Sequence, residues 1–565
     1  MTKECNAKPV DVLIVGAGIN GAGLFRDLCL QGVSTVLIDK GDYGSGTSAA
    51  PSRLIHGGIK YLETGELRLV AQSTLERNLL LKNAPHAVKP LPTIIPIFSW
   101  FNGVSAALRT LFGSVTAPRS RGALLIEIGL ILYDLYGARD RVMPRHRFWT
   151  KAKALAEMPF LTPRIVAAGT YHDAMVCVPE RLVLELVKDG LATAPQSEAH
   201  TYTSLEQSQG DIVTVCHEDG TRQTYRPRIL INAAGPWIDR VNGLLGFETK
   251  LIGGTKGSHI IIDSPELVAA LKGRMVYYEA DDGRICLVFD YHGRALVGST
   301  DVFADDPDKV RCEDDEIAYF LESLSGLLPD LKLERSQIVY CYSGIRPLPA
   351  ADNTEAGLVS RDHSSPRHAP DEMRPYPVIS LVGGKWTTFR GFAEEVCNRL
   401  LGELGLERQI STRAAPIGGG VNYPQSDHDK ANWLKQQRQL HAVSETRAWL
   451  LFERYGTTAS QIIALEASGY RLINGTRDHS DVEIDWIVRN EGVCHVMDIL
   501  VRRTLIGVDG SLTINALDDI ARICGNALGW SDARIQSEID DAARQLAERH
   551  RVTISSEGSG YAPLG

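Results

Sequence analysis

The sequence predicts a mixed α/β protein (α+β overall) in three parts: a Rossmann-type nucleotide-binding domain, an interleaved substrate domain on an antiparallel sheet, and a C-terminal helical domain. Three observations indicate this class. A strand, a glycine turn, a helix and a second strand open the chain over 10–39, and strand–glycine–helix units return at 228–241 and 377–396. Alternating β-forming segments lie between these units. Apolar residues at helical spacing follow over 428–553.

The opening unit predicts a dinucleotide site. Gly16, Gly18 and Gly21 match G-x-G-x-x-G between a strand and a helix, and Asp39 follows at the end of the second strand. Such glycines allow a tight turn, a close approach of the backbone to pyrophosphate, and close packing of helix on strand, while the acid binds ribose hydroxyls. These residues alone leave NAD and FAD open.

The later patterns set the predicted boundaries. A stretch rich in Gly, Pro and Ser follows the third strand unit and predicts a linker, and the last residues predict a loose tail. We predict a nucleotide-binding domain interleaved with a substrate domain over 1–410 (substrate part mainly about 80–225 and 245–350), a linker over 411–427, a helical domain over 428–553 and a tail over 554–565.

Composition excludes several classes of protein. The 565 residues carry 60 Lys+Arg against 69 Asp+Glu, and the net charge of −9 argues against broad nucleic-acid binding. The ten cysteines are scattered without metal-ligand spacing, so we expect reduced thiols and no metal site. The first ten residues lack an apolar signal segment, and no run reaches the roughly 18 apolar residues that a membrane span needs. We therefore expect a cytoplasmic protein that is not integral to a membrane.

Six motifs, in order between Val10 and Leu400, carry a resemblance to a known family. They are VGAGINGAGLFRD, SGTSAAPSRLIHGGIKYLETGELRLV, TKGSHIIID, LVGSTDV, YSGIRPL and GGKWTTFR. Together they resemble the FAD-dependent glycerol-3-phosphate dehydrogenases. The resemblance implies a glutathione-reductase-like FAD domain, a substrate domain over the flavin and a helical cap. It also implies non-covalent FAD, oxidation of sn-glycerol 3-phosphate to dihydroxyacetone phosphate by hydride transfer to FAD, and delivery of the electrons to a quinone.

The resemblance implies three catalytic residues. His56 matches a segment that runs beside the flavin ring, and an imidazole suits removal of the substrate hydroxyl proton. Arg346, in a Gly-Ile-Arg-Pro turn, suits a phosphate monoester, because a guanidinium supplies both charge and paired donors. Lys385 matches a cation near the flavin, where a positive charge stabilises the reduced ring.

The remaining site residues are carried over position by position. The implied substrate-binding residues are Lys60, Tyr61, Lys256, His259, Thr300 and Arg346. The implied cofactor-binding residues are Gly16, Gly18, Ile19, Asn20, Gly21, Asp39, Lys40, Thr47, Ser48, Ser52, Leu54, His56, Gly57, Gly58, Gly235, Trp237, Gly384, Lys385 and Thr387.

Two departures from the family pattern leave alternatives open. Lys60 stands where the family usually has arginine, and lysine lacks the planar fork that binds an oxyanion in two places. The segment from Cys177 to Pro179 replaces a common acidic pair. A dehydrogenase of another polyol phosphate such as erythritol phosphate, and an oxidase that uses oxygen, therefore remain alternatives. An amine oxidase and a flavin sensor without turnover fit the motifs less well.

A membrane contact is the last open point. Residues 94–121 mix bulky apolar side chains such as Trp100 and Phe101 with arginines, a composition that suits the lipid interface and equally suits a core helix with a basic end. The apolar run 123–137 is broken by Glu127, which favours a core helix or a shallow interfacial one. Peripheral contact with the inner face of the cytoplasmic membrane would give access to quinone. A homodimer is compatible with the sequence.

Overall fold

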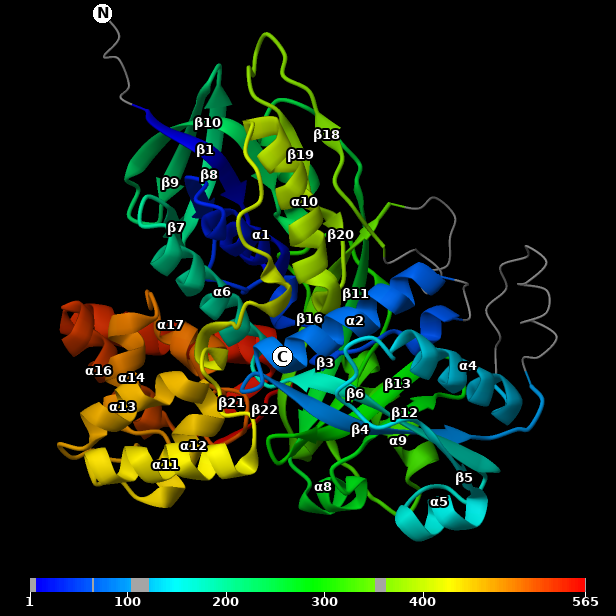
Figure 1. Cartoon of the computed structure of the whole chain (residues 1–565). Coiled ribbons are helices and arrows are strands. Elements are labelled where there is room, and N and C mark those ends of the chain that lie inside the picture. The colour runs from blue at the N-terminus through cyan, green and yellow to red at the C-terminus, as the bar shows by residue number, and fades with distance from the viewer. Residues whose placement is uncertain (1–6, 63–65, 103–120, 351–361, 564–565) are drawn as a thin grey trace, which may run out of the picture.

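The computed structural model describes residues 7–62, 66–102, 121–350 and 362–563. In Figure 1 the nucleotide-binding domain lies at the top, the substrate sheet at the lower right and the helical domain at the lower left. The chain passes from the nucleotide-binding sheet to the substrate sheet and back twice before it enters the helical domain. The predicted fold class is therefore confirmed.

Among the described residues, the nucleotide-binding sheet has eight strands. Its core is parallel, because β1 pairs in parallel with both β2 and β10, and β10 pairs in parallel with β19. Helices α1, α6 and α10 cover one face with a shared apolar core. The alternate residues of these strands, such as Leu13 and Leu230, join a second apolar core on the other face, so the strands are apolar on both faces. The strands are β1 (Lys8–Val15), β2 (Thr35–Ile38), β7 (Glu198–His200), β8 (Thr203–Gln209), β9 (Ile212–His217), β10 (Arg222–Asn232), β18 (Arg367–His368) and β19 (Val378–Ser380).

One predicted boundary is wrong. The predicted substrate part of about 80–225 includes residues 198–217, but β7 pairs with β2 and the β8–β9 hairpin continues from β10 in the nucleotide-binding sheet. Period-two alternation shows that a strand has one buried face. It does not show which of two sheets the strand joins.

Within the described part of the chain, the substrate sheet has ten strands and is antiparallel except where β4 meets β12. Strands β11 and β16 pair along almost their whole length, with Thr255 opposite Arg346. The predicted Gly-Ile-Arg-Pro turn is therefore wrong, because these residues lie within β16. Helices α8 and α9 pack on one face of the sheet in a separate apolar core. The strands are β3 (Leu54–Ile55), β4 (Val88–Ile97), β5 (Arg147–Thr150), β6 (Ala167–Val176), β11 (Ile252–Ile262), β12 (Met275–Glu279), β13 (Ile285–Tyr291), β14 (Arg294–Gly298), β15 (Val302–Phe303) and β16 (Ile338–Pro349).

The helices before the C-terminal domain connect and cover these two sheets, and a two-stranded ladder of β17 (His363–Ser364) and β20 (Val382–Gly383) lies between them. The helices and helical turns are α1 (Ile19–Leu30), η1 (Thr47–Ala49), η2 (Ile59–Leu62), α2 (Leu67–Asn83), α4 (Ala123–Tyr136), α5 (Lys151–Glu157), α6 (Pro179–Thr193), η3 (Gly235–Trp237), α7 (Ile238–Leu244), α8 (Pro265–Leu271), α9 (Asp314–Leu327), η4 (Arg335–Gln337), η6 (Trp386–Thr388), α10 (Phe389–Leu404), η7 (Thr412–Ala414) and η8 (Gly418–Gly420).

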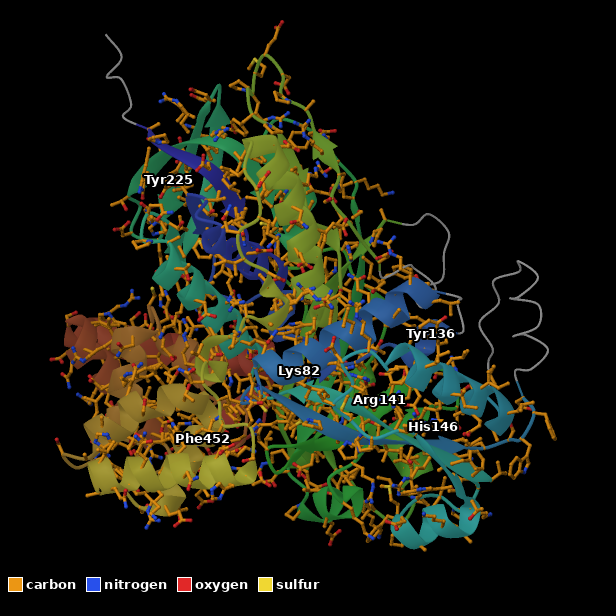
Figure 2. The ribbon with its side chains drawn as sticks, viewed as in Figure 1. Lys82, Tyr136, Arg141, His146, Tyr225 and Phe452 are labelled. Atoms are coloured by element: carbon orange, nitrogen blue, oxygen red, sulfur yellow. The ribbon has the colours of Figure 1, made fainter. Side chains whose placement is uncertain are left out.

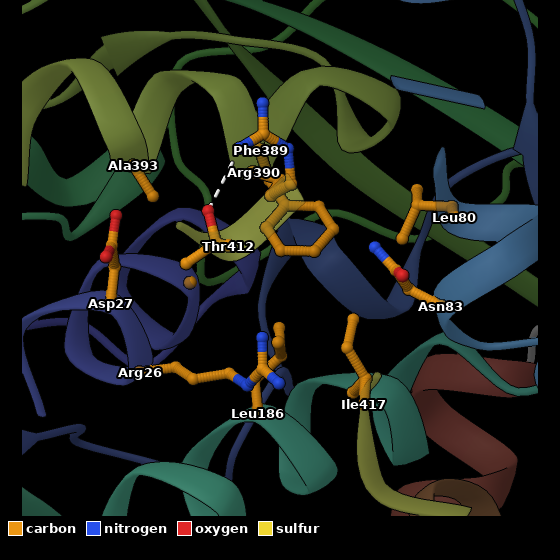
Figure 3. Close-up of a pocket in the computed structure, with 11 residues that line it drawn as sticks. Arg26, Asp27, Leu80, Asn83, Leu186, Phe389, Arg390, Ala393, Thr412 and Ile417 are labelled. Atoms are coloured by element: carbon orange, nitrogen blue, oxygen red, sulfur yellow. Dashed lines mark hydrogen bonds between the residues drawn. The ribbon is translucent and has the colours of Figure 1, made fainter. Parts of the chain in front are cut away.

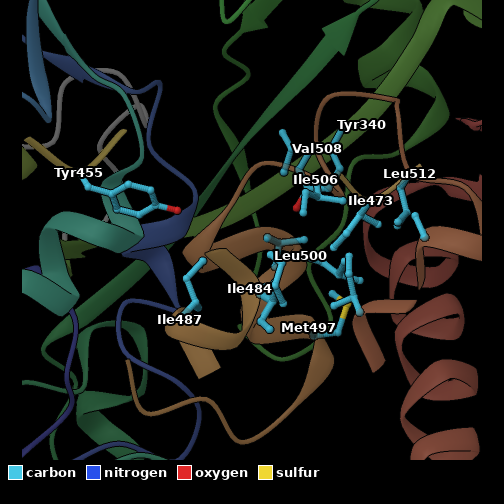
Figure 4. Close-up of a cluster of buried hydrophobic side chains, with 14 of the residues drawn as sticks. Tyr340, Tyr455, Ile473, Ile484, Ile487, Met497, Leu500, Ile506, Val508 and Leu512 are labelled. Atoms are coloured by element: carbon cyan, nitrogen blue, oxygen red, sulfur yellow. The ribbon is translucent and has the colours of Figure 1, made fainter. Parts of the chain in front are cut away.

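The C-terminal domain is a helical bundle, and its sequence marks where most of the long helices begin. A serine or threonine directly precedes most of its long helices, and its hydroxyl accepts a hydrogen bond from a first-turn backbone N–H. Isoleucine and leucine side chains fill the interior (Figure 4). The elements are α11 (Asp427–His441), α12 (Glu445–Tyr455), η9 (Gly456–Thr458), α13 (Ala459–Glu466), α14 (Asp481–Asn490), α15 (Val496–Asp498), η10 (Ile499–Arg503), α16 (Ile514–Leu528) and α17 (Asp532–His550).

The predicted loose tail is partly wrong. Strands β21 (Val552–Ile554) and β22 (Ser559–Tyr561) form an antiparallel hairpin, and Ala562 is buried. The hairpin packs on β16. Glycine and serine in this stretch form the turn of a hairpin, and that composition resembles a flexible tail.

Buried ion pairs join the helical domain to the nucleotide-binding domain. Asp42, in the loop after β2, accepts hydrogen bonds from Arg502 (2.6 Å) and Arg503 (2.6 and 2.9 Å) of η10. Arg181 at the start of α6 donates to Glu491 at 2.7 and 2.9 Å. Loss of one partner of such a buried pair would leave the other charge buried and unpaired. These contacts therefore fix how the two domains meet.

His495 adds a titratable contact to the same interface. Its Nδ1 lies 2.9 Å from Glu538 and its Nε2 lies 3.0 Å from Glu218. Desolvation alone would lower the pKa of His495, but the Glu538 hydrogen bond and nearby carboxylates raise it to about 8. A raised pKa stabilises the fold below the unfolded value of 6.5 and loses this effect as pH rises through about 8.

We therefore expect urea unfolding to show about 2 kcal/mol more stability from His495 at pH 6 than at pH 9. His495→Gln should remove that pH-dependent part of the free energy of unfolding. His428→Gln, on the exposed surface of α11, is the control and should keep it. Equal pH profiles for the wild type and His495→Gln would refute the assignment.

The search for membrane spans gives a negative result for the described residues. None of their helices is both long enough and apolar enough to cross a membrane.

Candidate active site

The glycine turn after β1 is built by close backbone contacts. Gly16 has a φ of +110°, and a Cβ there would lie 2.5 Å from the carbonyl oxygen of Ala233. A Cβ at Gly21 would lie 1.9 Å from the Gly16 oxygen. At Gly18, the closest described atom to such a Cβ is Ser48 Oγ at 3.2 Å. The fold thus requires the first and third glycines, while the second keeps the start of α1 open.

The residues around the start of α1 fit a dinucleotide. Asp39 accepts hydrogen bonds from the backbone N–H of Ala17 (2.6 Å) and Gly41 (2.9 Å). Burial raises the pKa of Asp39 to about 6, against the opposing effect of these hydrogen bonds. Asn20 donates to Gly383 at 3.3 Å, and its buried Oδ1 has no hydrogen-bond partner among the described residues. An acceptor carboxylate, an orphaned amide oxygen and an open helix N-terminus are what a ribose and a pyrophosphate need.

The chain after β2 carries the predicted flavin segment across to β16. Ser48 accepts from the backbone N–H of Ile19 (2.9 Å), and Thr47 donates to the carbonyl oxygen of Ile345 (2.6 Å). Tyr342 donates from β16 to the carbonyl of Pro51 at 2.9 Å. These contacts bring the start of α1 and the strand that bears Arg346 to one segment.

His259 faces the same segment from β11. Its Nε2 lies 2.8 Å from Ser52 Oγ, and its ring stacks on Tyr342 with centroids 4.7 Å apart. Burial, with the positive charges of Arg346 and Arg53, holds the pKa of His259 well below its usual value. The imidazole is therefore neutral, and within the described chain its buried Nδ1 has no hydrogen-bond partner.

Side chains on two sides hold the loop His56–Gly58. The His56 N–H donates to Thr387 Oγ1 of η6 at 3.1 Å. The Gly57 N–H donates to Tyr133 Oη at 2.9 Å and to Asp173 Oδ1 at 3.0 Å. Leu54 lies just before the loop, buried on β3, which pairs with β6.

An aromatic and cationic cluster follows this loop. The ring centroids of His56 and Tyr61 lie 6.2 Å apart, and the Lys385 ammonium lies 3.6 Å from the Tyr61 ring centroid. Lys385 also donates to Ser73 Oγ at 3.1 Å. Gly58 has a φ of +78°, and a Cβ there would lie 2.3 Å from Tyr61. The imidazole and phenol of one motif therefore meet the lysine of another.

Arg346 is held in one orientation. Its Nη1 donates to Asp301 at 2.7 Å, and its Nη2 donates to the Thr300 carbonyl at 2.9 Å and to Ser299 Oγ at 3.3 Å. A Cβ at Gly257 would lie 2.3 Å from Nη2, so this glycine lets the guanidinium lie across β11. A fixed, partly exposed guanidinium can bind an oxyanion without first being ordered.

Lys256 and Thr300 have protein partners already. Lys256 Nζ donates to Glu316 at 2.7 Å and to the Arg311 carbonyl at 2.9 Å. Thr300 Oγ1 donates to Glu316 at 2.6 Å and accepts from the Ser258 N–H at 2.9 Å. This network supports the 299–301 segment that holds Arg346.

The remaining predicted residues are two glycines and the side chains of Lys40, Lys60 and Trp237. Lys40 lies 4.1 Å from the Trp237 ring centroid, and both side chains contact Asp308. Gly235 has a φ of +56° and Gly384 a φ of +86°, and a Cβ at Gly384 would lie 3.2 Å from Asn20. Lys60 lies half-buried on η2, next to Tyr61.

A separate small cavity of about 10 Å³ lies between α1, α2, α6 and α10 (Figure 3). Its described lining includes Arg26, Phe389 and Arg390, and shares no member with the predicted site residues. The cavity is large enough for about one water molecule.

Comparison with known proteins decides the family. The model of the FAD dependent oxidoreductase family matches residues 11–371, and that of the C-terminal domain of alpha-glycerophosphate oxidase matches residues 410–535. A glycerol-3-phosphate dehydrogenase of Synechocystis is 32% identical over 94% of this chain and 95% of its own length. This chain belongs to the FAD-dependent glycerol-3-phosphate dehydrogenase family. The predicted cofactor, FAD, is confirmed with the family.

Other members of the family are similar to this chain over most of its length. The aerobic glycerol-3-phosphate dehydrogenase of Escherichia coli is 29% identical over 88% of this chain and 94% of its own length. A D-erythritol 1-phosphate dehydrogenase of Brucella abortus is also 29% identical, over 87% and 94%. The structure of a glycerol-3-phosphate dehydrogenase from Bacillus halodurans complexed with FAD shares the fold, with a TM-score of 0.73, 21% identity and 97% and 96% coverage.

Sequence reasoning missed the partners that hold the site residues. Asp301 stands inside the motif LVGSTDV, so its proximity to Arg346, the arginine predicted to bind phosphate, could have been inferred from the sequence. Asp173 is a lone carboxylate in an apolar strand, which is a weaker signal. Tyr133 and Glu316 lie on helices that carry none of the six motifs.

Proposed function

We propose that the protein oxidises sn-glycerol 3-phosphate to dihydroxyacetone phosphate and passes the electrons to a quinone. One observation carries this proposal. The segment 47–52 packs against β16, and so joins the fixed Arg346 guanidinium to the loop that bears His56 and to the dinucleotide-binding turn. An anion-binding arginine beside a redox site suits a phosphorylated alcohol better than an amine or a free polyol.

We assign the separate tasks of the proposed reaction to different side chains. FAD, which the glycine turn before α1 and Asp39 would hold, would supply the acceptor for a hydride from the carbon that bears the substrate hydroxyl. We assign the phosphate to Arg346, with Lys60 as an auxiliary charge, and the hydroxyl proton to His56. Lys385 supplies the fixed positive charge that favours a reduced flavin.

Two of the predicted substrate contacts receive another role. Lys256 and Thr300 are engaged with Glu316, so we assign them to the support of the 299–301 segment. Anaerobic mixing with glycerol 3-phosphate tests the proposal, because the reducing half of the reaction bleaches the flavin without any acceptor. A flavin that stays oxidised would reject it.

A second candidate substrate is a four-carbon polyol phosphate. The D-erythritol 1-phosphate dehydrogenase relative is nearly as similar to this chain as the glycerol-3-phosphate dehydrogenases are. Lys60 adds to this alternative, because a lysine gives an oxyanion a point charge without the fork of an arginine. Flavin bleaching by the four-carbon phosphate alone would favour it.

The acceptor is tested by following the return of the flavin to its oxidised form. We expect reoxidation by a water-soluble quinone analogue to be at least about tenfold faster than reoxidation in air, because a dehydrogenase must exclude oxygen to deliver electrons elsewhere. Stopped-flow mixing of the substrate-reduced protein with each acceptor measures this ratio. Rapid reoxidation in air with release of peroxide would indicate an oxidase instead.

Contact with a lipid surface would bring quinone within reach. Trp100 and Phe101 are exposed by 51% and 75%, whereas residues 103–120 of the predicted interfacial segment lie outside the described residues. Helix α4 presents an apolar stripe to solvent at helical spacing, with Leu135 exposed by 68%. The stripe consists of Leu124, Ile128, Ile131 and Leu135.

Basic residues border this stripe. Arg139, Arg145 and Arg147 are exposed in and after the loop that follows α4, close to Arg141 and His146 (Figure 2). An exposed apolar stripe with a basic border suits the interface of an anionic bilayer. We assign lipid contact to α4 together with Trp100 and Phe101.

Flotation with anionic vesicles tests this contact. Wild-type protein should float, and Ile131→Ser with Leu135→Ser should lose most of the floated fraction because the buried apolar area is lost. Leu440→Ser is the matched control, since Leu440 is 64% exposed on the helical domain. The control should float as wild type, and a wild-type protein that stays in the bottom fraction would remove the assignment.

A further inference from the structure

We propose that Tyr133 and Asp173 are positioning residues that hold the His56–Gly58 loop in its working geometry. The inference deepens the proposed function, because it rests on the role assigned to His56. Neither residue lies in one of the six motifs, and both come from elements far from the loop in sequence: Tyr133 from α4 and Asp173 from β6.

The hydrogen bonds converge on one backbone amide. The Gly57 N–H is shared between Tyr133 Oη (2.9 Å) and Asp173 Oδ1 (3.0 Å), and Tyr133 also donates to Asp173. Arg77 from α2 donates to Tyr133 Oη at 2.6 Å and to Asp173 at 3.0 Å. Three side chains from three elements therefore fix the direction of this single N–H.

The cluster is buried, which makes its polar character informative. Arg77 is 5% exposed, Tyr133 3% and Asp173 2%. Burying a charge pair costs free energy that apolar side chains of similar size would not cost. A buried pair whose acceptors point at one backbone N–H costs more free energy than apolar side chains would. It also holds the direction of that N–H.

The loop is shaped to receive the cluster. A Cβ at Gly57 would lie 2.4 Å from Tyr133 Oη and 2.5 Å from Thr74, so only glycine allows this approach. On the other side, the His56 N–H is held by Thr387 Oγ1 at 3.1 Å. Two consecutive amides are thus fixed by side chains, which sets the direction in which the His56 side chain leaves the backbone.

The hydroxyl of Tyr133 stays protonated throughout the working range. Burial raises the pKa of Tyr133 well above its usual value, and the neighbouring Asp173 raises it further, against the positive charge of Arg77. The hydroxyl can therefore donate to Asp173 while it accepts from the Gly57 N–H.

Tyr133→Phe tests the proposal with the smallest change. It removes the acceptor and keeps the ring, which packs edge-on against Tyr171 at 5.5 Å. We expect normal FAD content, an unchanged substrate dissociation constant and a rate of anaerobic flavin reduction that is about tenfold lower. Peptide-level hydrogen exchange of the holoenzyme should show faster exchange over 55–61.

Tyr171→Phe is the matched control. Tyr171 is buried, and its hydroxyl also interacts with Asp173. The hydrogen bonds of the Gly57 N–H go to Tyr133 and Asp173 instead. The control should keep both the reduction rate and the exchange of 55–61. Asp173→Asn, which keeps the shape of the side chain, should give at least the loss seen with Tyr133→Phe.

Two outcomes would overturn the inference. One is a Tyr133→Phe protein with wild-type reduction and wild-type exchange over 55–61. The other is an equal loss in Tyr171→Phe, which would make the cluster a general packing element. Should glycerol 3-phosphate fail to reduce the wild type, the proposed function fails, whereas the exchange comparison still decides the positioning role.

Discussion

Arg346→Ala should raise KM for glycerol 3-phosphate about 30- to 150-fold, because a charge-assisted contact to phosphate contributes about 2–3 kcal/mol. It should also lower kcat, since the phosphate anchors the reacting carbon. The guanidinium is already oriented by Asp301 and the Thr300 carbonyl, so its loss removes a prepared contact. Steady-state kinetics with a quinone analogue as acceptor measure both constants.

Two comparisons sharpen this prediction. Arg274→Ala is the control, because Arg274 pairs with Glu157 beside the same sheet and touches no site residue in the described structure. It should leave both constants unchanged. His56→Ala should instead slow flavin reduction while substrate still binds. A KM unchanged by Arg346→Ala would remove this arginine from phosphate binding.

Gly18→Val should yield a folded protein without FAD. A side chain at this position meets Ser48 Oγ at 3.2 Å among the described atoms, which a rotation of that hydroxyl can relieve. It would occupy the open start of α1, where a pyrophosphate must approach the backbone. The ratio of visible flavin absorbance to protein absorbance should fall to background, while far-ultraviolet circular dichroism stays as in the wild type.

Substitutions of two other glycines serve as comparisons for Gly18→Val. Gly16→Val should disturb the fold itself, because a Cβ there would lie 2.5 Å from the Ala233 carbonyl oxygen and the backbone has a φ of +110°. Gly243→Val, on α7, is the control, since a Cβ at that position meets no described atom within 4 Å. Retention of FAD by Gly18→Val would contradict the assigned pyrophosphate site.

The dinucleotide turn could be predicted from sequence because its requirements are local. Gly16 and Gly21 are needed by backbone contacts within one strand–turn–helix unit, and Asp39 ends the adjacent strand. Arg346 could be singled out from its residue type and its Gly-Ile-Arg-Pro neighbours, although these residues form a strand and not the predicted turn. In each case a few neighbouring residues carry the whole signal.

The residues that hold the site could not be predicted because they depend on register and packing. Lys256 and Thr300 have the right types for a substrate pocket, yet the pairing of β11 with its neighbours and of α9 with the sheet gives them Glu316 as a partner. Tyr133 and Asp173 meet at a backbone N–H, which leaves no trace in side-chain patterns. The strands over 198–217 show one buried face without showing which sheet they join.

Anaerobic bleaching of the flavin by a panel of substrates tests the central claim most directly. The panel contains glycerol 3-phosphate, erythritol phosphate, free glycerol and sarcosine, each mixed with the holoenzyme without an acceptor. We expect glycerol 3-phosphate to bleach the flavin fastest and free glycerol to be at least about 100-fold less effective, because Arg346 binds the phosphate. Equal bleaching by free glycerol, or bleaching by sarcosine alone, would contradict a glycerol-3-phosphate dehydrogenase.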